Sequence, residues 1–322
     1  MPAWGMTRIP GFLLAANEGA AAAAPAGWMQ QWGLALLTTA GLGVALLAFL
    51  YMTRSGIIAR AAAKEAIRQP VFPLLMAVSL MMLVLNTFIP FFSLGDDVKM
   101  LEICGLATML ICGMLLAIWT SSMSIADEIE GKTAMTLLSK PINRRQFIVG
   151  KFVGIQTAVL LQMIPVVIVF CGLIFYKVFY DARESSNDQV TMELARNEAF
   201  SVLPGVALCF LEITIMSAIS VAISTRLPMV VNMVTCLAIF VVGHLTPNLV
   251  GSNLGKLELV MFMARIISIV LPAVENFNVE TAIVTGSPVP AEYLGLTAIY
   301  SAAYATMAIL LAFILFEDRD LA

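Results

Sequence analysis

Long apolar runs constrain the fold of this chain more than any other feature of its sequence. Six runs lie between residue 71 and the C-terminus, and each is near or above the ~20 residues that a helix needs to cross a bilayer core. They are Val71–Leu94, Ile103–Met123, Phe152–Tyr176, Phe200–Ser224, Met229–His244 and Ala291–Phe316. Runs this long do not fit the roughly 10-residue alternating strands of membrane barrels, so we expect helices.

The composition supports the same fold class. Hydrophobic residues make up 60% of the 322 residues and charged residues only 12%, whereas soluble domains carry about 25% charged residues. This composition excludes a soluble globular enzyme, a disordered chain and a disulfide scaffold. The 18 Lys and Arg residues do not exceed the 21 Asp and Glu residues, so we expect no nucleic-acid partner. The predicted fold is an all-α polytopic membrane protein.

The first 70 residues divide into three predicted parts. Residues 1–27 have an apolar stretch too short for a signal peptide, so we expect a flexible tail. Residues 28–52 contain the apolar run Leu34–Met52 and predict an extra N-terminal transmembrane helix. Residues 53–70 have a helical period with Arg60, Lys64 and Arg68 on the polar face, which predicts an amphipathic helix on the cytoplasmic leaflet. The alternative for 53–70 is a plain basic loop.

The segment Leu257–Pro272 is short for a membrane span. Its 16 residues would give a helix of about 24 Å, and Glu258 and Arg265 fall on one side of it. We therefore expect a helix that lies at the membrane surface or re-enters from one side, with a true span as the alternative.

The distribution of basic residues predicts the orientation. If the segments 53–69, 124–151, 225–228 and the C-terminus share one side, that side holds most of the Lys and Arg residues. They are Arg54, Arg60, Lys64, Arg68, Lys132, Lys140, Arg144, Arg145, Lys151, Arg226 and Arg319. The positive-inside rule makes this side cytoplasmic, in the cell or inner membrane, and places the N-terminus outside.

The segment 124–151 is the longest polar stretch on the predicted cytoplasmic side. It begins as a helix-compatible sequence with acidic residues, is stopped by Ser139-Lys140-Pro141, and continues from Asn143, a predicted N-cap, into the next span. Gly131-Lys132-Thr133 is not a phosphate-binding loop, because Ala126 stands where the pattern needs a glycine and acidic residues surround it. We therefore expect that this chain hydrolyses no ATP itself and is not an enzyme.

This loop resembles the first cytoplasmic loop of type-2 ABC (ABC-2) transporter permeases. The resemblance lies in Glu128-Ile-Glu130-Gly131-Lys-Thr133, in the run Leu137-Leu138-Ser139-Lys140-Pro141, and in the Arg, Phe and Gly-Lys that follow. Leu271-Pro272 with Glu275-Asn276-Phe277, and the C-terminal Phe316-Glu-Asp-Arg319, are also similar to that family. The resemblance extends over about residues 54–322, and residues 1–53 lie outside it.

The resemblance implies a function and partners. The fold would be a six-span permease domain, residues 71–322, that forms a dimer with a second copy or a homologue, and an ABC ATPase subunit using ATP and Mg would dock at the loop. The residues implied to face the ATPase are Glu128, Glu130, Gly131, Thr133 and Leu137. Arg144, Arg145 and Lys151 are expected to anchor the loop or to contact anionic lipid. An ordinary solvated loop is the alternative.

Glu212 is an acidic residue inside the predicted span Phe200–Ser224. Intramembrane carboxylates are costly and often functional, so Glu212 is a candidate for a substrate pathway. Thr214, Ser217, Ser220 and Ser224 follow at helical spacing, which instead favours a structural role in helix packing. Two further functions stay open: a secondary transporter or channel that uses Glu212, and a membrane anchor of an envelope complex that moves no solute. His244 is expected at the interface, and the five cysteines show no metal-binding spacing.

Overall fold

The computed structural model is helical in the part of the chain that it describes. That part comprises residues 41, 43, 44, 46–88, 97–130, 143–184, 192–251, 271–287 and 289–317, and it contains no strand. The prediction of an all-α polytopic membrane protein is confirmed. The predictions for residues 1–27 and for nearly all of Leu257–Pro272 lie outside the described residues.

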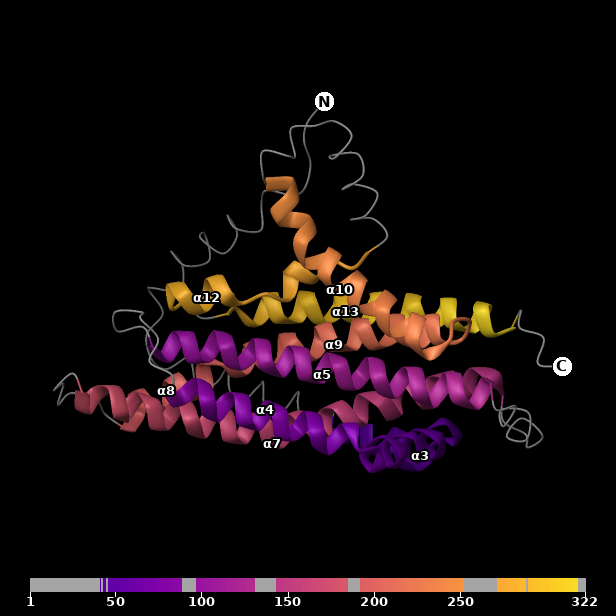
Figure 1. The fold of residues 1–322 in the computed structure, drawn as a ribbon, viewed down its shortest axis with the longest axis horizontal. Helices are drawn as coiled ribbons and strands as arrows, with labels where there is room; N and C mark the ends of the chain where they lie inside the picture. The colour runs from indigo at the N-terminus through magenta and orange to yellow at the C-terminus, as the bar shows by residue number, and fades with distance from the viewer. Residues whose placement is uncertain are drawn as a thin grey trace.

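Six long helices correspond to the six predicted spans. They are α4 (Val71–Phe88), α5 (Asp97–Glu130), α7 (Arg144–Glu184), α9 (Leu203–Ser224), α10 (Met229–Gly251) and α13 (Ala291–Glu317). Five helices run side by side along the long axis of the molecule, whereas α10 leans away from them (Figure 1). These five are long and apolar enough to cross a membrane, and the apolar part of α10, Met229–Leu245, is shorter.

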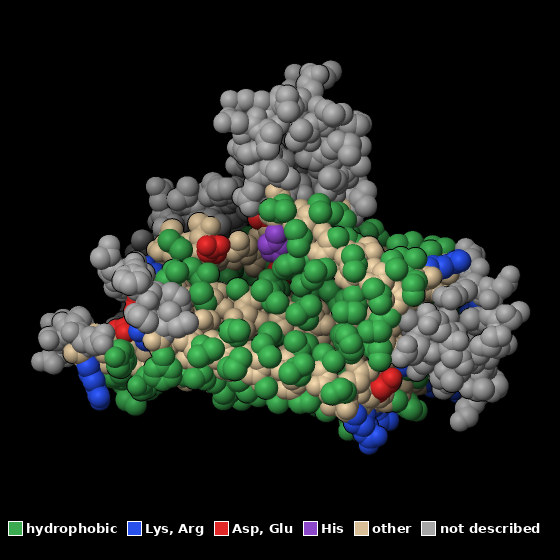
Figure 2. All heavy atoms as spheres, in the orientation of Figure 1, with side chains coloured by type: hydrophobic (Ala, Val, Ile, Leu, Met, Phe, Trp, Pro, Cys, Tyr) green, Lys and Arg blue, Asp and Glu red, His purple; other side chains and the backbone are tan. Residues whose placement is uncertain are grey.

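The centre of the bundle is formed by α5 and α9. In each of these helices 61% of the most apolar stretch is buried, against 22% in α4. Fully buried large side chains include Leu101, Phe170 and Leu208. Hydrophobic side chains also cover the middle of the visible surface, while charged side chains gather towards its two ends (Figure 2). This is the distribution that a bilayer requires, with polar groups at the water interfaces.

A sharp bend connects the N-terminal helical segment Leu46–Met52 to α3 (Arg54–Arg68), and the two axes differ by 104°. Thr53 caps α3, since its hydroxyl oxygen accepts the backbone N–H of Gly56 at 2.9 Å. A Cβ atom on Gly56 would lie 2.6 Å from the carbonyl oxygen of Leu50. A larger residue at position 56 would therefore collide with the preceding helix at this bend.

The helix α3 packs on the start of α7 through small residues on both sides. Its buried residues are Gly56, Ala59, Ala62, Ala63 and Ala66. On α7, a Cβ atom added to Gly150 or Gly154 would come within 2.8 Å of α3 backbone oxygens. Such close approach is typical of small-xxx-small interfaces. Ile57 of α3 is 59% exposed.

The predicted span Phe200–Ser224 is divided near its start. The helix α8 (Met192–Ser201) ends one residue before Val202, and α9 begins at Leu203 with Pro204 in its first turn. Proline is tolerated there because the first N–H groups of a helix have no partner within it. Two short helices follow the α10 region, the 3-10 helix η2 (Val274–Phe277) and α12 (Glu280–Thr285), which ends at Gly286 with φ 65°.

Candidate functional site

One end of the bundle collects α3, the end of α5, the start of α7, the α9–α10 turn and the end of α13 (Figure 1). Most of the described Lys and Arg residues lie on these segments, and we call this region the basic end. It contains Arg54, Arg60, Lys64, Arg68, Arg144, Arg145, Lys151 and Arg226. The same segments were predicted from the sequence to share one side of the membrane.

The predicted coupling loop is flanked by two long helices at the basic end. The helix α5 continues beyond Met123, where the predicted apolar run ends, through Glu128 to Glu130. The helix α7 begins at Arg144, directly after the predicted cap Asn143, whose backbone N–H is accepted by the Gln146 side chain at 3.4 Å. This hydrogen bond, from the backbone of the cap residue to the side chain three residues later, is one of the two that form a capping box.

Part of the predicted ATPase contact cannot be placed. The backbone of Glu128 and Glu130 is helical, but their side chains lie outside the described part of the structure. Gly131, Thr133 and Leu137 also lie outside it. The role of these residues in contacting the ATPase therefore stays a prediction.

Arg144 and Arg145 occupy different positions at the start of α7. Arg144 donates to the backbone oxygen of Phe316 in α13 at 3.4 Å, and its guanidinium lies 5.8 Å from the centre of that ring. Phe147, one turn further along α7, stacks on the same ring with centroids 6.0 Å apart. Arg145 is exposed. The N-terminus of α7 is thus fastened to the end of the last helix.

Lys151 is buried rather than directed to lipid. It is 3% exposed, and its ammonium donates to the Ser124 hydroxyl oxygen at 2.7 Å and lies 3.5 Å from the Glu65 carboxylate. We therefore correct the expected lipid contact of Lys151, and its anchoring role connects α3, α5 and α7. Sequence reasoning missed its two partners, although Gly150 and Gly154 beside it indicate a tightly packed helix face.

Polar side chains also connect the helices within the apolar part of the bundle. Gln156 of α7 accepts the hydroxyl of Thr214 in α9 at 3.2 Å. Asn232 of α10 donates to Ser220 of α9 at 3.0 Å and to Ser122 of α5 at 2.8 Å. Hydrogen bonds of this kind hold helices together where water is absent. Thr214 and Ser220, two of the hydroxyl residues that follow Glu212 at helical spacing, therefore have the predicted structural role in helix packing.

Glu212 of α9 lies opposite His244 of α10. The Glu212 side chain is 3% exposed and that of His244 is 32% exposed, with Oε1 of the acid 3.6 Å from Nε2 of the imidazole. Among the described residues this Oε1 has no hydrogen-bond partner. A buried acid beside a half-exposed imidazole can take up a proton or hold a cation.

The Glu212–His244 pairing was not predicted from the sequence. Both residues lie roughly three to four helical turns from the short α9–α10 turn. Because consecutive helices joined by a short turn run antiparallel, residues equally far from that turn meet. Counting turns from this connection is the sequence signal that could have found the pair.

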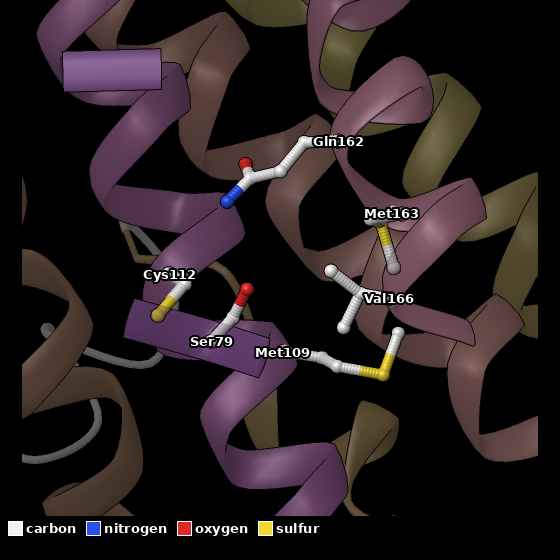
Figure 3. Close-up of a pocket in the computed structure, with 6 residues that line it drawn as sticks. All are labelled: Ser79, Met109, Cys112, Gln162, Met163 and Val166. Carbon is white, nitrogen blue, oxygen red and sulfur yellow. The ribbon is translucent and has the colours of Figure 1, made fainter. Parts of the chain in front are cut away.

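A small cavity lies between α4, α5 and α7 (Figure 3). Its lining residues are Ser79, Met109, Cys112, Gln162, Met163 and Val166. Its volume of about 10 Å³ is room for one water molecule at most. The Oε1 atom of Gln162 is buried without a hydrogen-bond partner in the described residues, so a water is the occupant that fits, and a transported solute is not.

The opposite end of the bundle is fastened by an ion-pair cluster. The ammonium of Lys177 in α7 lies 3.3 Å from the carboxylate of Asp97 in α5 and 3.0 Å from that of Asp181.

All five cysteines are free. Within the described ranges, no group of three or more His, Cys, Asp or Glu side chains is placed to hold a metal ion.

The comparison with known families identifies the class of protein. Residues 27–321 match the family model described as ABC-2 family transporter protein. The chain therefore belongs to the ABC-2 family, and it is a multi-pass permease component of the ABC transporter class, which partners an ABC ATPase subunit. A search of curated proteins found no match. The family match begins at Gly27 rather than Arg54, so the expectation that residues 1–53 lie outside the family pattern is wrong for residues 27–53.

Proposed function

We propose that this chain is the transmembrane subunit of an ATP-driven exporter, and that a separate ATPase chain supplies the energy at the loop between α5 and α7. The observation that carries this proposal is the continuity of the two flanking helices. The 34 residues of α5 and the 41 residues of α7 give lengths of about 51 Å and 62 Å. Both helices are longer than the ~20 residues needed to cross the bilayer. A displacement of the loop would therefore move two helices that reach the opposite face of the membrane.

The ATPase would contact the loop through Glu128, Glu130, Gly131, Thr133 and Leu137. The ATPase would bind ATP and Mg, and this chain would bind neither. Support comes from the α5 helix, which carries the two acidic residues beyond its apolar part. Ser124, Glu65 and Lys151 connect the base of this extension to α3 and α7. An extension anchored at its base transmits force better than a free loop.

The basic end would face the cytoplasm by the positive-inside rule. This orientation places the C-terminus in the cytoplasm and the N-terminus outside, in the cell or inner membrane. A second copy of the chain or a homologue would complete the transporter, and Val230 and Val234 at the start of α10 are 70% and 63% exposed and so available to such a partner or to lipid.

Co-purification with the cognate ATPase tests the proposal. The double variant Glu128→Lys/Glu130→Lys should lose the ATPase during purification and should lose transport-linked ATP hydrolysis, because both acidic groups are reversed. The control is Glu193→Lys, an exposed acidic residue of α8 at the opposite end of the bundle. Equal retention of the ATPase by wild type and double variant would contradict docking at this loop.

The Glu212–His244 pair favours a second candidate, transport coupled to protons without an ATPase. In this case vesicles containing the purified chain alone would show pH-driven uptake, and Glu212→Gln would abolish it. Absence of such uptake in the wild-type chain would exclude this candidate.

A further inference from the structure

A groove lies at the C-terminal end of α3, where the chain turns into α4. Its lining residues are Ala61, Lys64, Glu65, Arg68, Gln69 and Pro70, and its volume is about 540 Å³. This volume lies within the ~300–1,000 Å³ range of small-molecule sites. We propose that the groove binds the phosphate headgroup of an anionic phospholipid. The proposal rests on the orientation proposed above, which places α3 at the membrane–water interface.

The charge of the groove suits an anion. Lys64 and Arg68 are one helical turn apart and share a face of α3, and within the described residues neither makes an ion pair. The acidic residue of the groove, Glu65, is already engaged, since its carboxylate lies 3.5 Å from the buried ammonium of Lys151 and accepts the Ser124 hydroxyl at 3.5 Å. The groove therefore keeps two positive charges that its own acidic residue does not balance.

The apolar surroundings select a lipid over a soluble phosphate. Ile57 and Ile67 of α3 are 59% and 38% exposed, and Leu74 in the first turn of α4 is 60% exposed. These side chains lie on both helices that form the groove, so a bound headgroup has apolar surface beside it for its acyl chains. Mixed basic and apolar surface is typical of helices that lie in the headgroup region.

Lipid titration of the purified full-length chain in detergent tests the proposal. Native mass spectrometry would follow binding of a soluble short-chain phosphatidylglycerol, with phosphatidylcholine and inorganic phosphate as separate arms. Lys64→Gln and Arg68→Gln should each weaken phosphatidylglycerol binding about fivefold, and phosphatidylcholine should bind more weakly to the wild type. The control Arg226→Gln removes an exposed basic residue of the basic end outside the groove and should leave binding unchanged.

Several results would overturn the proposal. Unchanged affinity in both groove variants, or an equal loss in Arg226→Gln, would show that no specific site exists. Displacement of phosphatidylglycerol by an equal concentration of inorganic phosphate would identify a free phosphate as the ligand. Loss of the ATPase from the groove variants with lipid binding intact would identify a protein contact. Retained ATPase binding alongside a failed lipid titration would leave the proposed function standing.

Discussion

The tight contact between α3 and α7 gives the sharpest prediction, a substitution of Gly154 by alanine. A Cβ atom at this position would lie 2.7 Å from the Ala59 carbonyl oxygen and 2.7 Å from the Ala62 Cβ. Carbon atoms pack best at about 3.5–4.0 Å. The helix α3 would therefore have to move away from α7 by about 1 Å.

The expected cost follows from two opposing terms. Overpacking of a tight interface costs about 1–3 kcal/mol, while replacement of glycine by alanine within a helix gains up to about 1 kcal/mol. The matched control is Gly172→Ala on the same helix, where an added Cβ meets nothing within 4 Å. Only the gain applies there, so the two variants should differ in their free energy of unfolding by about 1–3 kcal/mol, with Gly154→Ala the less stable.

Unfolding of both variants in a detergent–SDS series, followed by far-UV circular dichroism, measures this difference. A second readout is maleimide labelling of Ala62→Cys, with the native cysteines replaced, because Ala62 is 2% exposed in the packed interface. Gly154→Leu should make this cysteine reactive. Equal stability of Gly154→Ala and Gly172→Ala would refute the packing argument.

Substitutions at three further positions test the polar contacts of the bundle, each by the shift of the unfolding transition in the same detergent series. Lys151→Leu should destabilise by about 1–2 kcal/mol, because its hydroxyl partner loses a donor while its carboxylate partner stays half-solvated; a shift no larger than that of Arg145→Leu, which is exposed, would count against it. Glu212→Lys should cost more than about 3 kcal/mol by placing a cation in a buried apolar site, whereas Glu212→Gln should stay within about 1 kcal/mol; similar shifts for both would show that the position is solvated. Asn232→Leu should cost roughly 1 kcal/mol, since two intramembrane hydrogen bonds at about 0.6 kcal/mol each are lost, and a stabilised variant would contradict this.

The helices could be predicted from the sequence because bilayer burial requires long apolar runs. All six runs after residue 71 correspond to helices, and Asn143 stands directly before α7 as expected. Although their opposite ends, which reach Asp97 and Glu184, were underestimated, the extensions of α5 and α7 at the basic end were predicted from the helix-compatible sequence after Ser124 and from the N-cap Asn143. Their continuation past Ile125 and back to Arg144 follows from helix propensity and packing rather than from hydrophobicity.

The side-chain contacts of the candidate site were much less predictable. Lys151 is a basic residue near the expected membrane surface, which suggests a contact with lipid. It is buried between Glu65 and Ser124 only because α3 and α5 approach it in the folded structure. The close packing of α3 on α7 was not predicted, because it depends on glycine and alanine residues that a hydrophobicity pattern does not single out. Glu212 and His244 meet because of the register between two helices, which single-residue arguments do not contain.

The contacts of Arg144 and Phe147 with Phe316 have a practical consequence for work on this protein. The final helical turn of α13 is part of the same assembly as the entrance to α7, so the carboxyl-terminal end is not an inert place for a purification tag. A fusion partner seated directly after Phe316 would press on the segment through which an associated ATPase would act.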